Sequence, residues 1–238
     1  YHNGRVKNIL TSVVSKKDGD YVASLKASLS ALNENVSYIP TLLNEVLLHR
    51  DLNYKITVEN LFAKYKSNKI LNGVSFDVLQ GELICLCGPN GCGKSTLLSV
   101  LAAVNDNDLE CENFPKVQIF ENSGNIKKSF FVKELKRKDC AKIISYMGQN
   151  ENSIWNFSVY DVILSGRFAY SKNGSYSKED FLIVDEIIEE LNLGELKNRS
   201  VHNLSGGEFQ KVRIARSLAQ TPKFMLLDEQ ALYPILSE

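Results

Sequence analysis

The chain has 238 residues with 28 basic and 28 acidic side chains, so its net charge is zero. Hydrophobic residues make up 44% and charged residues 24%, which is typical of a globular protein and excludes a largely disordered one. The balanced charge gives no support to nucleic acid or anionic lipid as a partner. No apolar stretch approaches the roughly 18 residues of a membrane span.

The five cysteines are odd in number and include no C-x-x-C pair, so we expect a reducing cytoplasm and no zinc site. No apolar segment followed by a small-residue cleavage site occurs near the start, so no signal peptide is predicted. The chain begins with Tyr1 rather than Met, and we therefore expect it to be a fragment.

Residues 1–53 are predicted to form a helical N-terminal extension of unknown role. Between residues 22 and 36, apolar side chains recur every three or four positions, which indicates an amphipathic helix that ends before Pro40. The preferred interpretation is a helix packed on the main domain. A partner-binding or membrane-surface helix is the alternative, and the weakly basic polar face argues against it.

Residues 54–238 have the pattern of an α/β domain. Residues 74–78 alternate as a half-buried strand does, and residues 83–87 form the continuous apolar run of a buried parallel strand. Strands are predicted at 142–147 and 224–227, and helices at 158–165, 178–191 and after Ser205. Alternating strands and helices imply a mainly parallel sheet flanked by helices.

Residues 88–96 match the phosphate-loop pattern G-x-x-x-x-G-K-[ST], known as Walker A. Glycines let backbone N–H groups surround phosphate oxygens, and the N-terminus of the following helix adds partial positive charge. Lys94 is expected to reach the β- and γ-phosphates, and Ser95 to offer its hydroxyl to Mg²⁺. The pattern predicts that ATP and Mg²⁺ are bound. The nucleotide-binding residues of the loop are Gly88, Pro89, Asn90, Gly91, Cys92, Gly93, Lys94, Ser95 and Thr96.

The apolar run 224–227 ends in two acidic residues, Asp228 and Glu229. The carboxyl ends of parallel strands lie near the phosphate loop, so we expect Asp228 close to Mg²⁺, directly or through water. Glu229 is expected to orient or deprotonate the attacking water. An exposed strand end is the alternative for this common pattern, and the phosphate loop favours the catalytic interpretation.

Residues 204–208, Leu-Ser-Gly-Gly-Glu, resemble the LSGGQ signature of ATP-binding cassette (ABC) proteins, with Glu208 where Gln is commonest. A serine hydroxyl, two glycines and a helix N-terminus form an anion site. In that family the signature binds the γ-phosphate held by the other cassette of a dimer. The resemblance thus implies nucleotide contacts from Ser205, Gly206, Gly207 and Glu208, and a second cassette, in a homodimer, as partner.

The resemblance covers residues 55–229 and implies a P-loop NTPase fold with an ABC-type helical subdomain. Tyr65 matches the aromatic that stacks on adenine, with a half-buried strand tyrosine as the alternative. Gln149 resembles the glutamine that contacts Mg²⁺ and water, with a surface amide as the alternative. Lys94, Gln149 and Glu229 form the implied catalytic set, and Ser95, Gln149 and Asp228 the implied metal ligands.

A narrower resemblance lies in Gly166-Arg167-Phe168, which is similar to a segment of importer ATPases for iron–siderophore, haem and cobalamin, with Ala169 in place of Pro. It implies an ATPase subunit that is cytoplasmic, peripheral on the inner face of the membrane, and bound to permease subunits. The alternatives are a soluble non-transport ABC ATPase and a truncated, non-catalytic ATP-binding remnant.

The sequence departs from the ABC pattern after Glu229. The family continues with a D-loop and, roughly 30 residues later, a switch histidine, by the same resemblance. The three histidines of the chain, His2, His49 and His202, do not match that position. We therefore expect an incomplete C-terminal part, and weak or no turnover by the chain as given.

Overall fold

The computed structural model describes residues 54–82, 84, 86, 89–104, 108–120, 126–148 and 156–228. The predicted extension, residues 1–53, lies outside the described residues. The chain divides after Leu135 into two compact units. Residues up to 135 are called unit 1, and residues from 136 are called unit 2.

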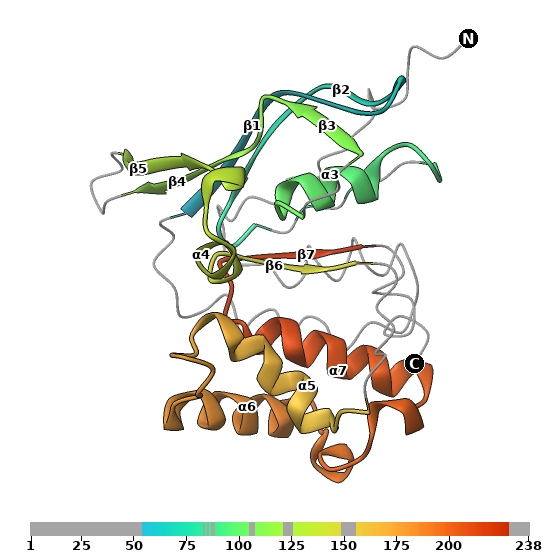
Figure 1. Ribbon diagram of the computed structural model, residues 1–238, viewed down its shortest axis with the longest axis vertical. Coiled ribbons are helices and arrows are strands. Elements are labelled where there is room, and N and C mark those ends of the chain that lie inside the picture. Colours follow the sequence, from blue (N-terminus) through green and yellow to red (C-terminus); the bar gives the residue numbers. More distant parts are fainter. Residues whose placement is uncertain are drawn as a thin grey trace, which may run out of the picture. The chain divides into compact units, whose positions relative to one another are not determined.

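Unit 1 is built on a five-stranded sheet in which every described pairing is antiparallel. Its strands are β1 (Tyr54–Tyr65), β2 (Asn68–Leu79), β3 (Leu109–Glu112), β4 (Lys116–Phe120) and β5 (Ile126–Phe131), followed by a 3₁₀ turn, η1 (Val132–Glu134). The strand order is β2-β1-β4-β5, and β3 pairs with the C-terminal part of β1 (Figure 1). Helix α3 (Lys94–Leu101) completes the described elements of this unit.

A bulge in β1 sets which of its side chains enter the core. Ile56 and Val58 are buried, and so are Leu61 and Ala63, although strict alternation would expose the second pair. The register shifts between Val58 and Leu61, where Asn60 adopts a φ of 48°. The extra residue turns the later part of the strand back toward the core.

The predicted mainly parallel sheet is found in part, because the strands of unit 1 are antiparallel. Only Lys66 and Ser67 separate β1 from β2, and so short a connection can join antiparallel neighbours only. A parallel pair requires a crossover of about a dozen residues or more. Three residues of the strand predicted at 83–87 lie outside the described residues.

Unit 2 contains the parallel pair. Strands β6 (Ile144–Met147) and β7 (Phe224–Leu227) run parallel in register, with Ile144 beside Phe224 and Met147 beside Leu227. The helices are α4 (Arg137–Ala141), α5 (Val159–Ser165), α6 (Lys178–Glu190) and α7 (Gly206–Ala219), with 3₁₀ turns η2 (Gly166–Ala169), η3 (Gly194–Leu196) and η4 (Val201–Asn203). These bounds confirm the predicted strand at 224–227. They also agree, within one or two residues, with the strand predicted at 142–147 and with the helices predicted at 158–165, 178–191 and after Ser205.

Helices α5, α6 and α7 contact one another, and α7 also contacts β6 (Figure 1). Their shared core consists of residues that are almost completely buried, namely Val159, Ile163, Val184, Val212 and Ala215. Each helix begins at a capping box, in which a serine and an acidic residue three positions later exchange hydrogen bonds. The pairs are Ser158 with Asp161, Ser177 with Asp180, and Ser205 with Glu208.

Gly166 lies where η2 comes closest to α7. A Cβ atom at this position would stand 2.3 Å from the carbonyl oxygen of Arg216 and 3.2 Å from the Cβ of Ala219. We expect Gly166→Ala to lower the free energy of unfolding by about 1–3 kcal/mol, because backbone must shift to admit the methyl group. Gly194→Ala is the matched control, since its added Cβ would meet no atom within 4 Å. Urea unfolding that gave the same stability for both variants would contradict this account.

Candidate functional site

The loop before α3 forms a turn whose middle residues are exposed. The N–H of Cys92 donates to the carbonyl of Pro89 at 3.2 Å, and Nζ of Lys94 donates to the same carbonyl at 3.4 Å. Asn90 and Gly91 are exposed, and Gly91 adopts a φ of 77°. Gly88, the first residue of the predicted loop, lies outside the described residues.

Gly93 is the residue at which this loop leads into helix α3. Its φ of 101° is left-handed, and an added Cβ would lie 3.0 Å from Cγ2 of Ile70 and 3.1 Å from Cδ2 of Leu71 on β2. The backbone conformation therefore favours glycine here, and the space beside Ile70 and Leu71 is tight. Helix α3 starts at the next residue, Lys94, and its first turn contains no acidic side chain.

This arrangement suits a phosphate. The first N–H groups of an α-helix have no partner within the helix, and they carry partial positive charge. In α3 those groups belong to Lys94, Ser95 and Thr96, which are the residues that the sequence predicted. Ser95 is exposed, while Leu97 and Leu98 anchor the helix in the core of unit 1.

Tyr65 is the last residue of β1. It pairs with Asn68 across the β1–β2 turn and with Leu109 of β3, and it is half-buried. The structure therefore places it at a strand end beside a tight turn, and its stacking on adenine stays a prediction.

The signature segment forms the N-terminus of α7. Ser205 caps the helix: its hydroxyl accepts from the N–H of Glu208 at 3.3 Å, and its own N–H donates to Oε2 of Glu208 at 2.7 Å. The hydroxyl of Ser205 also donates to Oε2, at 2.8 Å. Gly206 and Gly207 supply the first helical residues, and Nη1 of Arg199 lies 3.8 Å from Oε1 of Glu208.

Glu208 is held as a carboxylate. The backbone N–H of Ser205 and then its hydroxyl, followed by the charges of Arg199 and Lys211, hold the pKa of Glu208 below its ordinary value of 4.5. The signature therefore carries a negative charge at neutral pH where glutamine is the commonest residue of the resembling family.

Asp228 follows β7 and is 3% exposed. Its N–H donates to the carbonyl of Met147 at 3.1 Å, so it lies beside the carboxyl end of β6. The parallel pair β6–β7 thus brings the strand end before Asp228 beside the strand end before Gln149. The predicted position of Asp228 close to Mg²⁺ stays a prediction. Gln149 and Glu229 lie outside the described residues.

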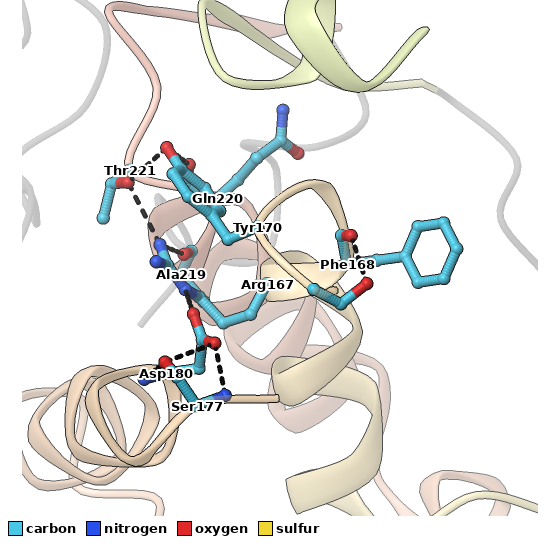
Figure 2. A network of polar contacts seen from close by, with 9 residues as sticks. Arg167, Phe168, Tyr170, Ser177, Asp180, Ala219, Gln220 and Thr221 are labelled. Carbon is cyan, nitrogen blue, oxygen red and sulfur yellow. Dashed lines mark hydrogen bonds and ion pairs between the residues drawn. The ribbon is translucent and has the colours of Figure 1, made fainter. Parts of the chain in front are cut away.

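Arg167 and Asp180 form a buried ion pair whose importance the sequence analysis did not recognise (Figure 2). Nε of Arg167 lies 2.8 Å from Oδ1 of Asp180, and Nη1 donates to the carbonyl of Ala219 at 2.8 Å and to Oγ1 of Thr221 at 3.1 Å. The hydroxyl and the N–H of Ser177 donate to Oδ2 of Asp180. The pair therefore joins η2, the start of α6 and the end of α7.

The Gly166-Arg167-Phe168 segment thus has a structural explanation for two of its residues. Gly166 allows the close approach to α7, and Arg167 is 4% exposed within the ion-pair network. Phe168 is 58% exposed, and its ring points away from that network in Figure 2. Nζ of Lys138 lies 5.0 Å from the centroid of this ring.

The Asp180 carboxylate makes the stability of the protein depend on pH in the acidic range. Burial raises its pKa, but hydrogen bonds from Ser177 and the pairing with Arg167 outweigh burial and hold the pKa below the ordinary 3.8. The carboxylate therefore contributes stability above that value and loses it as pH falls through the folded pKa. We expect the stability difference between wild type and Asp180→Asn to be constant above about pH 5 and to shrink below 3.8. Urea unfolding at several pH values measures it, and a difference that grew in acid would contradict the pairing.

The family model described as ABC transporter matches residues 71–231. The chain belongs to the ABC transporter family. The match includes the phosphate loop, the signature and Asp228, and solved ABC transporter structures share the fold. ABC ATPases bind and hydrolyse ATP as a family, and the role of the loop before α3 in nucleotide binding stays a prediction.

Two curated relatives and one solved structure show how far the likeness extends. An uncharacterized ABC transporter ATP-binding protein of Methanocaldococcus jannaschii is 35% identical over 174 residues, covering 73% of this chain and 63% of the relative. A petrobactin import ATP-binding protein of Bacillus anthracis is 31% identical over 175 residues, covering 73% and 64%. An inward-facing ABC transporter described as of metal-chelate type matches with a TM-score of 0.55 and 28% identity, covering 75% and 61%.

The chain therefore spans less than two thirds of the length of these relatives. Among the residues that the structure describes, no helix combines the length and the hydrophobicity needed to cross a membrane.

Proposed function

We propose that the chain is the ATP-binding and ATP-hydrolysing subunit of an ABC importer for iron–siderophore, haem or cobalamin. The observation that carries the ATP-binding role is the loop before α3, where a left-handed Gly93 leads into a helix whose first turn has no acidic residue. The cargo class is supported by the Gly166-Arg167-Phe168 resemblance, the petrobactin-import relative and the metal-chelate structure.

In this proposal the residues of unit 1 bind the nucleotide. Backbone N–H groups of residues 88–96, except Pro89, which has none, surround the phosphates, and Lys94 contacts the β- and γ-phosphates. Ser95 offers its hydroxyl to Mg²⁺, and Tyr65 stacks on adenine. When Mg²⁺ is bound, it would supply positive charge that offsets the negative charge developing on the phosphate oxygens.

The residues of unit 2 supply the hydrolytic groups. Asp228 and Gln149 provide the carboxylate and amide oxygens that Mg²⁺ prefers as ligands, directly or through water. Glu229 orients or deprotonates the water that attacks the γ-phosphorus. The Ser205 hydroxyl and the backbone N–H groups of Gly206, Gly207 and Glu208 bind the γ-phosphate held by a second copy of the chain. The Ser205 hydroxyl then donates to that phosphate in place of Oε2 of Glu208.

We place residues 54–238 in one ABC-type ATP-binding domain and residues 1–53 in a helical extension. The partners are a second cassette, in a homodimer, and two permease subunits at the inner face of the cell membrane, to which the cytoplasmic chain binds. The zero net charge supports a partner other than nucleic acid.

Affinity purification from the source organism distinguishes an importer subunit from a soluble ABC ATPase. The tagged protein is captured from detergent-solubilised membranes and from the soluble fraction, and the captured proteins are identified by mass spectrometry. We expect a polytopic permease to be captured from the membranes. Capture of ribosomal or repair proteins from the soluble fraction, without a permease, would contradict the proposal.

A further inference from the structure

Two polar side chains on the buried face of α7 hold the end of β6. Gln210 and Arg213 lie one helical turn apart and are 4% and 5% exposed. Nη1 of Arg213 donates to Oε1 of Gln210 at 3.0 Å, and Nε2 of Gln210 lies 4.0 Å from Sδ of Met147. Nη2 of Arg213 donates to the carbonyl of Gly148, the residue after β6. Arg213 thus links α7 to residue 148.

This carbonyl belongs to the peptide bond that joins Gly148 to Gln149, the proposed Mg²⁺ and water ligand. The preceding carbonyl, of Met147, accepts from the N–H of Asp228. The two carbonyls before Gln149 are therefore held by different elements: Met147 by the residue that follows β7, and Gly148 by α7. Arg213 holds the last described carbonyl before Gln149.

An arginine at position 213 fits this geometry. A guanidinium group is planar and donates in fixed directions, so one side chain holds the Gln210 amide and the Gly148 carbonyl together. A lysine has a single nitrogen on a flexible stem and does not reproduce that fork. Burying a charge is costly unless it is well hydrogen-bonded, so a residue that contributed only packing would be apolar here.

We infer that Arg213 is a positioning residue that fixes the Gly148–Gln149 peptide and couples it to the signature helix. Ser205 caps the same helix, about two turns before Arg213, so a displacement of the signature reaches residue 148 through one rigid helix and one hydrogen bond. The role assigned to Gln149 rests on the proposed function, whereas the Arg213–Gly148 bond does not.

The Gly148–Gln149 peptide is open to direct measurement. Nowhere else in the sequence does Gln follow Gly, so labelling glycine with carbonyl ¹³C and glutamine with ¹⁵N gives one HNCO signal. We expect Arg213→Lys and Arg213→Met each to move its carbonyl shift upfield, because a charged donor is lost or displaced. Lys211→Met, which removes a charge from the same helix, is the matched control and should leave the signal in place.

Addition of Mg²⁺-ATP tests the positioning role itself. We expect the wild-type signal to move, and the Arg213→Lys signal to move by less than half as much at equal nucleotide affinity. An Arg213→Lys signal at the wild-type position without nucleotide would overturn the inference, as would an equal response to Mg²⁺-ATP. A wild type that bound no ATP would contradict the proposed function alone. If Arg213→Met does not fold, Arg213→Lys decides.

Discussion

Replacing Arg167 with Met is expected to lower the free energy of unfolding by about 3–5 kcal/mol. The substitution leaves the Asp180 carboxylate buried without its cation, and it removes the donor to the carbonyl of Ala219 at the end of α7 (Figure 2). The guanidinium also stacks 3.8 Å from the centroid of the Tyr170 ring, and this contact is lost as well. Urea unfolding monitored by circular dichroism measures the change.

An exposed ion pair of the same unit is the matched control. Nζ of Lys197 lies 2.6 Å from Oδ1 of Asp185, but these side chains are 37% and 49% exposed. Solvent screens such a pair, so Lys197→Met should cost less than about 1 kcal/mol. The double variant of Arg167→Met and Asp180→Asn should lose less than the sum of the single variants, because it leaves no unpaired charge. Additive losses would show that the two side chains do not act as a pair.

Replacing Lys94 with Ala is expected to weaken ATP binding by about 10- to 100-fold. A hydrogen bond from a charged donor contributes about 1.5–3 kcal/mol, and a tenfold change in affinity corresponds to about 1.4 kcal/mol. Lys94 opens α3 directly after Gly93, so the variant removes the cation and keeps the helix N–H groups. Isothermal titration with Mg²⁺-ATP measures the affinity.

Lys69→Ala is the control for this change, because Lys69 is an exposed cation on β2 of the same unit. It should bind ATP with wild-type affinity. Equal affinities of the Lys94 and Lys69 variants would show that nucleotide binds elsewhere or without the loop.

The elements that were predicted best from the sequence are those formed by consecutive residues. The phosphate loop, the signature and the strand before Asp228 each lie in one short segment, and each has the expected local structure where it is described. The capping boxes at Ser158, Ser177 and Ser205 show the same principle, since a segment of four residues fixes where a helix begins.

What the sequence analysis missed depends on residues far apart in the chain. The bond from Arg213 to Gly148 spans 65 positions, and no periodicity indicates it. The antiparallel sheet was missed because the β1–β2 turn is Lys-Ser, not the Asn-Gly or Asp-Gly pair that marks a tight hairpin. Arg167 was noticed within a family segment, but only the fold shows that it pairs with Asp180, 13 residues away.

Nucleotide-dependent dimerisation tests the central claim, that the chain carries both halves of a composite ATP site. The Glu229→Gln variant retains the phosphate loop and the signature and lacks the proposed catalytic carboxylate. Its molar mass is measured by light scattering with Mg²⁺-ATP and with Mg²⁺-ADP. We predict a dimer with ATP and a monomer with ADP, and a monomer with ATP when Ser205→Arg is added. A molar mass that does not change with saturating ATP would contradict the account.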